Sequence, residues 1–418
     1  MKKEYIDIAI IGGGCAGLSA ALSAKQAGAA RVVVFERAPE LGGVLRQCIH
    51  NGFGIHRFGE DLTGTQYARR LVDQIRETDV QCLTSTIVLD LSAERVLIAM
   101  NEGGITEYNA KAVILATGCR ERPRGALAIP GTRPAGIVSA GTAQRYLNLE
   151  GYLVGKRIII LGSGDIGLIM ARQFVLEGAH VIAVAERLPY SSGLMRNIVQ
   201  CLDDFDIPIF YRSTVTRIVG ENRVEGVYLS EVDACNCPIP ATERFIECDT
   251  LLLSVGLIPE NELASQAGLA LLPFTGGPVV DDSFQTGLDG IFCCGNALHV
   301  HDLVDFVSIE SEIAGRMAAQ YTQAPTHRDC EVVHVHDGPG VRGIVPQIIR
   351  RNAAETQVTL QFRPDTRYGA CYIEVYEGET RIARAKHAVL TPGEMIEIKI
   401  PRAEIHADIT VKVSTVFT

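Results

Sequence analysis

The chain has 418 residues, of which 47% are hydrophobic and 21% charged, and its formal net charge is -10 at pH 7. This length provides for about two to four domains with well-buried cores. This net negative charge argues against sequence-independent binding to a nucleic-acid backbone, which needs clustered Lys and Arg. We therefore expect no nucleic-acid partner. The 41 glycines follow no triplet repeat and accompany many Val, Ile and Leu residues, so they indicate tight turns rather than collagen or disorder.

The N-terminal residues indicate the compartment. Residues 1–7 lead into a short apolar run that ends at Gly12, without the apolar core and cleavage site of a signal peptide. No apolar run approaches the length of a membrane span. We therefore expect a cytoplasmic protein, and we expect its 12 irregularly spaced cysteines to be reduced thiols.

Two segments of the chain repeat the same order of elements. Residues 6–11 predict a strand, residues 12–17 a glycine-rich turn, residues 18–27 a helix, and residues 31–35 a second strand that ends at Glu36. The order recurs as a strand at 157–161, a turn at 162–167, a helix through residue 177, and a strand at 180–185 that ends at Glu186. The sequence therefore contains an internal duplication of a strand-turn-helix-strand unit.

Each copy has the features of a dinucleotide-binding turn. The first glycine permits the tight turn, the second allows a pyrophosphate to approach the backbone, and the third allows the helix to pack closely on the strand. The N–H groups and the helix dipole then bind the diphosphate. Glu36 and Glu186 follow the third glycine at the same spacing, close to the ~20 residues expected for a ribose-binding acid. These turns use Gly12, Gly14 and Gly17 in the first copy and Gly162, Gly164 and Gly167 in the second.

The other segments are simpler. Residues 63–77 predict an amphipathic helix with Tyr67, Leu71 and Ile75 on one face, and residues 95–116 are typical of strands. After about residue 326 the chain consists of short alternating segments, which predict a small all-β sandwich. These segments are residues 358–362, 371–376, 381–389, 395–400 and 409–417.

Over roughly residues 5–325 the chain resembles the flavoprotein pyridine nucleotide-disulfide oxidoreductases that have two dinucleotide-binding domains. The resemblance rests on residues 12–17 with Glu36 and Gly42-Gly43, residues 116–118, 122–123 and 129–131, residues 162–167 with Glu186, residues 254–259 with Asn261, and residues 286–296. It implies an α/β fold with two Rossmann-like domains. The FAD-binding domain would comprise residues 1–150 and 281–325, the inserted NAD(P)H-binding domain residues 151–280, and a C-terminal β-rich domain residues 326–418.

The resemblance also implies the cofactor-binding residues. Glu186 would bind the ribose 2′-hydroxyl and repel a 2′-phosphate, which favours NADH, while Arg187 softens that preference. Near its end the family usually has a Gly-Asp pair that binds the flavin, which we call the late flavin motif. This chain has Gly295-Asn296 there, and asparagine keeps a hydrogen-bond acceptor but lacks the negative charge of aspartate. For FAD the expected residues are Gly12, Gly14, Cys15, Ala16, Gly17, Glu36, Arg37, Gly43, Val44, Ala116, Thr117, Gly118, Gly295 and Asn296. For NAD(P)H they are Gly162, Gly164, Asp165, Ile166, Gly167, Glu186, Arg187, Val255 and Gly256.

A narrower resemblance concerns partners. Asn296 and residues 49–54 and 298–305 are similar to flavoproteins that accompany flavin-dependent glycerol-3-phosphate dehydrogenases, a subgroup related to subunits of cyanide-forming and opine dehydrogenases. It implies a partner flavin-dependent dehydrogenase subunit, or a small-molecule or protein electron acceptor. The C-terminal module is then a docking surface for the partner or, alternatively, a dimerisation or capping module in a homo-oligomer. We favour docking.

The cysteines bear on the reaction. Disulfide reductases of the family carry two cysteines after Gly-Gly or a C-x-x-C in the second domain, whereas this chain has Cys48 alone after Gly42-Gly43 and no C-x-x-C. We therefore expect an FAD-dependent oxidoreductase that passes hydride between NAD(H) and a second acceptor or partner dehydrogenase without a redox disulfide. The alternatives are an electron-transfer subunit of a glycerol-3-phosphate or amino-acid/opine dehydrogenase complex, and a single-cysteine NADH oxidase or peroxidase.

The candidate catalytic residues are Cys48, His50 and His56. Cys48 could form a sulfenic acid, although its offset from the glycines favours inert packing. His50 and His56 flank a glycine-bearing loop near the expected flavin ring, where they either exchange protons near neutral pH or are surface or backbone-bonded residues.

No metal is expected from the sequence. His299, His301 and Asp302 follow the late flavin motif, but two histidines at i and i+2 without a clear further ligand set are more typical of a loop that they orient. Cys235, Cys237 and Cys248 also fall short of a structural zinc set, and we expect them to be unligated thiols.

Overall fold

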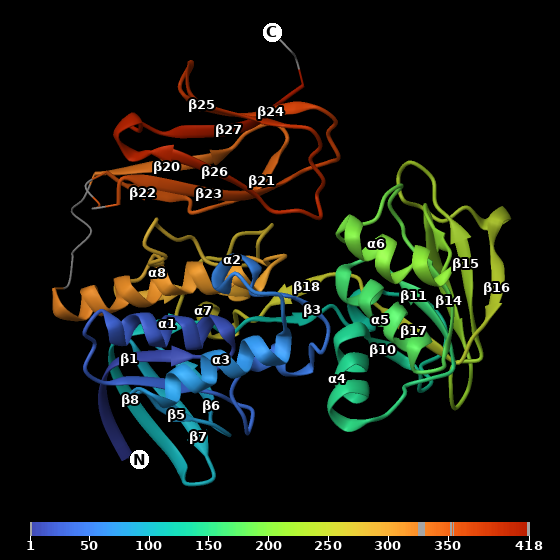
Figure 1. Ribbon diagram of the computed structural model, residues 1–418, viewed down its shortest axis with the longest axis horizontal. Helices are drawn as coiled ribbons and strands as arrows, with labels where there is room; N and C mark the ends of the chain where they lie inside the picture. Colours follow the sequence, from blue (N-terminus) through green and yellow to red (C-terminus); the bar gives the residue numbers. More distant parts are fainter. Residues whose placement is uncertain (1, 325–330, 352, 354, 416–418) are drawn as a thin grey trace. The chain divides into compact units, whose positions relative to one another are not determined.

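The chain forms two compact units, shown in the computed structural model, which describes residues 2–324, 331–351, 353 and 355–415 (Figure 1). Unit 1 is Met1–Cys119 with Pro259–Thr418, and unit 2 is Arg120–Ile258. None of the helices in these described ranges is long and apolar enough to cross a membrane. The expected boundary at residues 325 and 326 lies outside the described residues.

Unit 1 is built on a seven-stranded sheet in the order β5-β2-β1-β8-β7-β6, with β19 paired to β8. The central strands are parallel and buried on both faces, so they consist of continuous apolar runs. Ile8, for example, lies beside Val32 on one side and Ala112 on the other. The strands are β1 (Lys2–Ile11), β2 (Val32–Phe35), β5 (Gln81–Leu83), β6 (Ile87–Leu91), β7 (Val96–Asn101), β8 (Gly104–Leu115) and β19 (Ile291–Cys293).

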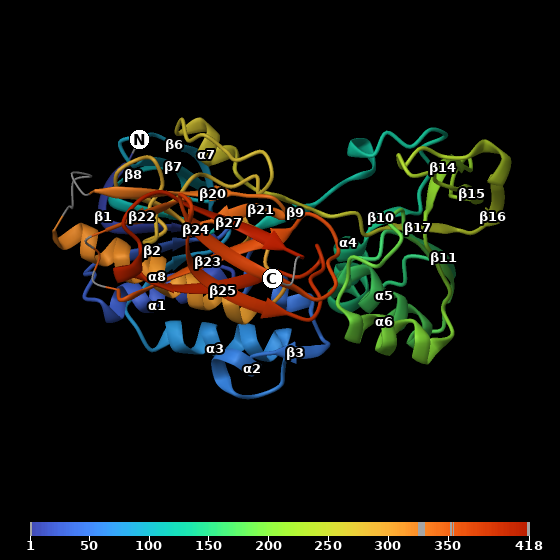
Figure 2. The same ribbon diagram turned by 90° about the horizontal axis from the view of Figure 1, so that it is seen from above.

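Three helices cover one side of this sheet. Figure 2 shows α1 (Cys15–Gln26), α3 (Gly64–Arg76) and α8 (Val304–Gln323) together on one side of β1 and β8. The amphipathic helix expected at 63–77 is confirmed as α3, where Thr63 forms a capping box with Gln66. The shorter elements of unit 1 are β3 (Asn51–Phe53), α2 (Ile55–Phe58), β4 (Leu62–Thr63) and α7 (Glu262–Gln266), with β9 (Cys119–Glu121) and β18 (Leu257–Pro259) at the junctions with unit 2.

Unit 2 contains a five-stranded parallel sheet in the order β10-β17-β11-β12-β13, and a separate three-stranded antiparallel sheet. The unit begins before the expected residue 151 because β10 already pairs with β17. It ends before residue 280 because Ala264 and Ala267 belong to the core of unit 1. The elements are β10 (Ile137–Ser139), α4 (Ala140–Glu150), β11 (Arg157–Leu161), α5 (Asp165–Leu176), β12 (His180–Ala185), α6 (Met195–Cys201), β13 (Ile209–Phe210), β14 (Ser213–Val219), β15 (Gly226–Glu231), β16 (Arg244–Glu247) and β17 (Thr250–Leu253).

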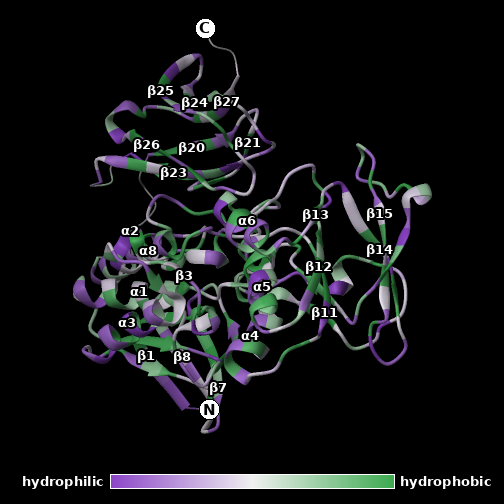
Figure 3. Cartoon of the chain, turned by 45° about the vertical axis from the view of Figure 1, so that its right-hand side comes forward, coloured by the Kyte–Doolittle hydropathy of each residue, from purple (hydrophilic) through white to green (hydrophobic). Residues whose placement is uncertain are grey.

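The C-terminal part of unit 1 is an all-β sandwich with its own apolar core, as the alternating segments predict. Its sheets have the orders β22-β20-β27-β24-β25 and β21-β23-β26. Hydrophobic and hydrophilic residues alternate along β23 and β26, and every second residue of β26 is buried (Figure 3). The strands are β20 (Val332–Asp337), β21 (Val341–Val345), β22 (Ile348–Arg350), β23 (Gln357–Pro364), β24 (Cys371–Glu377), β25 (Thr380–His387), β26 (Ile396–Pro401) and β27 (Ile409–Ser414).

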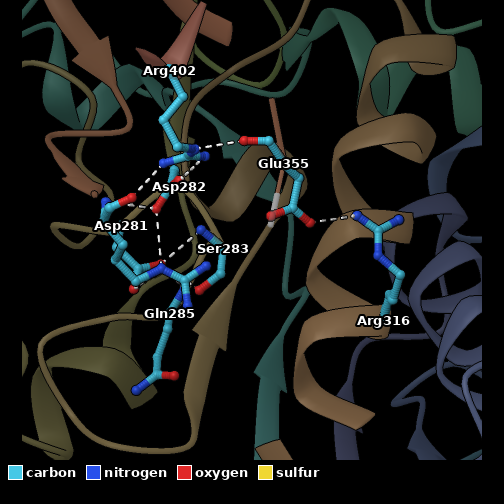
Figure 4. A network of polar contacts seen from close by, with 8 residues as sticks. Asp281, Asp282, Ser283, Gln285, Arg316, Glu355 and Arg402 are labelled. Carbon is cyan, nitrogen blue, oxygen red and sulfur yellow. Dashed lines mark hydrogen bonds and ion pairs between the residues drawn. The ribbon is translucent and has the colours of Figure 1, made fainter. Parts of the chain in front are cut away.

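Buried charges fasten the sandwich to the rest of unit 1 (Figure 4). The Arg402 guanidinium donates to Asp282 Oδ2 at 2.6 Å and to the carbonyl of Glu355, and Arg350 donates to Asp282 Oδ1 at 3.1 Å. Burial raises the pKa of the neighbouring Asp281. Because a buried carboxylate must be paired to be stable, these contacts fix the attachment point of the sandwich.

The contact between α1 and α8 depends on a glycine. A Cβ on Gly315 would lie 2.1 Å from the carbonyl oxygen of Ala20. We expect Gly315→Ala to destabilise unit 1 by about 1–3 kcal/mol, because the backbone must shift and the helix propensity of Ala does not offset that cost. The measurement is the thermal unfolding midpoint. Gly369→Ala is the matched control, since a Cβ there meets no atom within 4 Å. Equal midpoints for the two variants would contradict the close packing.

Candidate cofactor-binding site

The first glycine turn joins β1 to α1. Gly12 has φ +114°, and a Cβ there would lie 2.2 Å from the carbonyl oxygen of Ala116; a Cβ on Gly17 would lie 1.8 Å from that of Gly12. Both positions therefore require glycine. At Gly14, the N-cap of α1, a Cβ would meet only Gly43 at 3.8 Å, and no side chain caps the helix. A helix N-terminus with room beside it and no capping side chain fits a phosphate group.

A buried carboxylate closes this turn. Glu36, the residue after β2, is 8% exposed; its Oε2 accepts the Gly13 N–H at 2.7 Å, and its Oε1 accepts the Ala38 N–H at 2.7 Å. The two bonds compensate the cost of burying the charge and hold the carboxylate beside the turn.

The second copy has the same two backbone hydrogen bonds to its carboxylate. Gly162 has φ +91°, and a Cβ there would lie 2.1 Å from the carbonyl oxygen of Ser254. Glu186 is also buried; its Oε2 accepts the Ser163 N–H at 3.0 Å, and its Oε1 accepts the Leu188 N–H at 2.8 Å. The Ser163 hydroxyl adds a third bond to Oε2 at 2.5 Å. The duplication is therefore present in the structure as well as in the sequence.

Other residues expected at the second turn have different surroundings. Asp165 Oδ1 accepts the Leu194 N–H at 2.8 Å and the Asn197 side-chain amide at 2.6 Å, so this carboxylate anchors the N-terminal end of α6. Arg187 and Gly256 are exposed, and Ile166 and Val255 are half-buried.

The segment around Gly295 lies against the first turn. A Cβ on Gly295 would lie 2.8 Å from Ala16 Cβ, and one on Gly43 would lie 2.9 Å from Gly14 Cα. The structure therefore brings residues 14–16, Gly43 and Gly295 together at the N-terminus of α1. Beside them, the Thr117 hydroxyl donates to the carbonyl of Glu260 at 2.7 Å. Gly118 has φ +73° and open space around it.

Asn296 is held from both ends of its amide. Its Oδ1 accepts the His301 N–H at 3.0 Å, and its Nδ2 donates to Cys119 Sγ at 3.6 Å. Of the remaining residues expected to bind FAD, Cys15 is half-buried, Val44 is exposed, and Arg37 is exposed with Glu260 Oε2 at 3.8 Å.

The three candidate catalytic residues lie on one segment with different environments. Cys48 is buried, and burial raises the pKa of its thiol to about 12. The rings of His50 and Phe53 lie 5.0 Å apart, and the exposed His56 ring stacks on Phe306 at 5.2 Å. The structure thus gives Cys48 the character of a packed thiol.

Two buried acids of α8 were missed in the sequence. α8 begins at Val304, and Asp305 in its first turn accepts the N–H groups of Gly54 and Arg57, each at 3.0 Å. Glu310 Oε1 accepts the Gly295 N–H at 2.6 Å, and its Oε2 faces His299 Nε2 at 2.7 Å. Burial alone raises the pKa of Glu310, but the neighbouring histidines outweigh it and hold that pKa at about 2. No sequence pattern set them apart, because α8 also carries Glu312 and Arg316.

The two turns, each at the carboxyl end of a parallel sheet with a strand-end acid, define a protein with two dinucleotide-binding folds. Residues 6–325 match the family model described as pyridine nucleotide-disulphide oxidoreductase, and the chain belongs to that family. Members are FAD-dependent oxidoreductases that use NAD(P)H. The expected fold class, enzyme class and cofactors are therefore confirmed.

Individual relatives are distant. An opine oxidase subunit of Agrobacterium tumefaciens (strain Ach5) is 25% identical over 336 residues, which cover 76% of this chain and 65% of that protein. An alkyl hydroperoxide reductase subunit of Staphylococcus aureus (strain MRSA252) is 25% identical, with coverages of 71% and 54%. The chain thus spans less than two thirds of the length of these relatives. Thioredoxin reductase of T. acidophilum has a similar fold, with a TM-score of 0.63, 23% identity, and coverage of 77% of this chain and 100% of that one.

The Glu36 carboxylate gives a direct test of the first site. In Glu36→Gln the amide can accept only one of the two N–H groups that the carboxylate accepts, and an unsatisfied buried donor costs about 1–3 kcal/mol. We expect FAD affinity to fall by about tenfold to a hundredfold. The flavin content of purified protein and a titration with FAD measure this. The control is Glu40→Gln on the exposed part of the same loop; an equal effect of both changes would contradict the role of Glu36.

The Cys48 thiol has an expected pH response. Because its pKa is raised to about 12, Cys48 stays protonated below that pH and is a poor nucleophile. We expect negligible alkylation of Cys48 by iodoacetamide from about pH 6 to 9, while the exposed Cys235 and Cys237 react. Peptide mapping by mass spectrometry checks this in folded protein. Rapid labelling of Cys48 with a midpoint near neutral pH would contradict burial as the controlling factor.

Proposed function

We propose that this chain transfers hydride between NAD(H) and a second electron acceptor through FAD, without a redox-active disulfide. The observation that carries the proposal is the matched pair of turns, each with a required glycine and a buried carboxylate that accepts two backbone N–H groups. One turn belongs to unit 1 and the other to unit 2, so each unit has its own dinucleotide site. We assign FAD to unit 1 and the nicotinamide cofactor to unit 2.

The assignment of FAD to unit 1 rests on the convergence around Gly14. Gly43 and Gly295 approach the N-terminus of α1, where a diphosphate is stabilised by the helix dipole and free N–H donors. Glu36 then offers its remaining lone pairs to the ribose hydroxyls. FAD held there would supply hydride acceptance from the nicotinamide and electron donation to the next acceptor.

The nicotinamide preference rests on Glu186. Its carboxylate is already fixed by Ser163 and Leu188, so it is preorganised for a ribose 2′-hydroxyl and opposes the charge of a 2′-phosphate. The exposed Arg187 is the nearest cation in sequence, and it weakens that opposition without removing it. This arrangement supports NADH as the preferred cofactor.

Two observations support a reaction without a redox disulfide. The sequence contains no C-x-x-C motif, and Cys48 is buried with a raised pKa. A buried neutral thiol suits neither thiol-disulfide exchange nor attack on a peroxide. Both observations therefore also weigh against a single-cysteine peroxidase.

A second candidate function is that of an electron-transfer protein that accepts electrons from a partner dehydrogenase within a complex. It is favoured by the similarity to the opine oxidase relative, a protein named as a subunit. The sandwich after residue 330 offers a surface for such a partner, because it has a core of its own and lies beyond the residues that match the family.

An anaerobic titration of the purified flavoprotein separates the two candidates. If the proposal is right, NADH bleaches the flavin absorbance near about 450 nm without any added protein, and NADPH does so more slowly. We expect Glu186→Gln to reduce the NADH preference by about tenfold, or ~1.4 kcal/mol. Glu177→Gln, an exposed change at the end of α5, is the control.

A failure of NADH to reduce the flavin would also distinguish the two candidates. A flavin that NADH leaves oxidised, but that is reduced when a co-purifying dehydrogenase and its substrate are added, excludes the first candidate and supports the second. Peroxide turnover that is lost in Cys48→Ser would instead establish the peroxidase.

A further inference from the structure

Three buried side chains next to the late flavin motif converge on one point. His299 and His301 come from the segment between β19 and α8, and Glu310 comes from α8. Their side chains are 4%, 1% and 3% exposed. One potential ligand atom from each residue lies within 4.8 Å of the other two. Glu310 Oε2 is 2.7 Å from His299 Nε2 and 3.3 Å from His301 Nε2.

The hydrogen bonds determine the tautomer of His301. Its Nδ1 lies 3.0 Å from the backbone carbonyl oxygen of His299, which can only accept, so Nδ1 carries the proton. The Nε2 of a neutral His301 then presents a lone pair, and it faces a carboxylate oxygen that is also an acceptor. In the part of the chain that the structure describes, this buried Nε2 has no hydrogen-bond partner. A positive centre is therefore required between the two atoms.

A metal ion meets this requirement better than a proton does. A proton on His301 Nε2 would join only that nitrogen to the Glu310 carboxylate. A divalent ion binds both imidazole lone pairs and the carboxylate at once. Tetrahedral zinc ligands with bonds of about 2.0–2.2 Å lie ~3.3 Å apart, which is the spacing between Glu310 Oε2 and His301 Nε2. The 2.7 Å spacing to His299 would widen when the ion replaces the shared proton.

The surroundings also resemble those of a metal site. Ligating histidines usually donate their other N–H to a carbonyl or carboxylate, as His301 Nδ1 does. Ligating carboxylates are themselves hydrogen-bonded, and Glu310 Oε1 accepts the Gly295 N–H at 2.6 Å. Asp302 is not part of this group, because its Oδ2 accepts the Met395 N–H at 2.6 Å and its Oδ1 pairs with Arg363.

We propose that His299, His301 and Glu310 bind one divalent transition-metal ion, with Zn²⁺ as the best match to two imidazoles and one carboxylate. The ion fastens the segment after β19 to α8 and so fixes Gly295 and Asn296. This proposal is independent of the proposed hydride transfer, since it concerns binding and not turnover.

The test measures zinc bound to the full-length, FAD-loaded protein. The protein is stripped with a chelator, incubated with zinc sulfate, passed through a desalting column and analysed by inductively coupled plasma mass spectrometry. We expect about one zinc per chain for the wild type and a loss of at least about tenfold in affinity, by competition with a chromophoric chelator, for His301→Asn and Glu310→Gln. Asn at position 301 keeps a donor for the carbonyl of His299 while it removes Nε2.

The chain supplies a matched control. His334 and His336 form a second i, i+2 histidine pair on β20, and both are exposed. His336→Asn should leave the bound zinc unchanged. If wild type and His301→Asn retain equal zinc at equal flavin content, the proposal is wrong. If a variant fails to fold, X-ray absorption at the zinc edge of the wild type decides, because a spectrum without imidazole ligands overturns the proposal.

Discussion

The structure depends on a buried carboxylate at the end of a parallel strand. In both units this group takes the N–H at the second position of the glycine turn and the N–H two residues after itself. It can do so only because the strands that carry the turn and the acid are neighbours, as Ile11 and Phe35 are in unit 1. In unit 1 the first N–H groups of α1 are then left for a ligand, since the carboxylate fixes the turn without capping the helix. In unit 2 the Gly167 N–H, in the first turn of α5, donates to the Ser254 hydroxyl at 3.1 Å. The buried carboxylate thus fixes the conformation of the turn in the absence of a cofactor.

This constraint explains how much of the site could be predicted from the sequence. Glu36 and Glu186 were found because they are separated from the glycines by one helix and one strand, a spacing set by local geometry. Asp165 was expected at the phosphate on its position alone, whereas its bonds to Leu194 and Asn197 depend on a segment about 30 residues away. Glu310 and Asp305 were missed because their partners come from other elements. Long-range pairings of this kind leave no spacing that can be read along the chain.

In the fold, too, locally determined features were predicted and long-range pairings were not. The alternation of residues in the C-terminal segments predicts a sandwich, because one face of each strand must enter a core. The attachment of that sandwich through Arg402 and Asp282 was not predicted, since charged pairs distant in sequence carry no periodicity. The extent of unit 2 was also set by long-range pairing, because β10 joins a sheet whose other strands follow it by 18 residues or more.

The hydrogen bonds of Glu260 bear on how such a chain is assembled. Its N–H donates to the carbonyl of Gly118 at 2.9 Å, and its carbonyl accepts from the Thr117 hydroxyl. The chain therefore leaves unit 1 and returns to it at the same place. If residues 120–258 were removed, the two ends would already be neighbours, and a link of about two residues would rejoin them. A segment that leaves and re-enters at one place can be added, removed or exchanged as a single block while the strand register of unit 1 is kept.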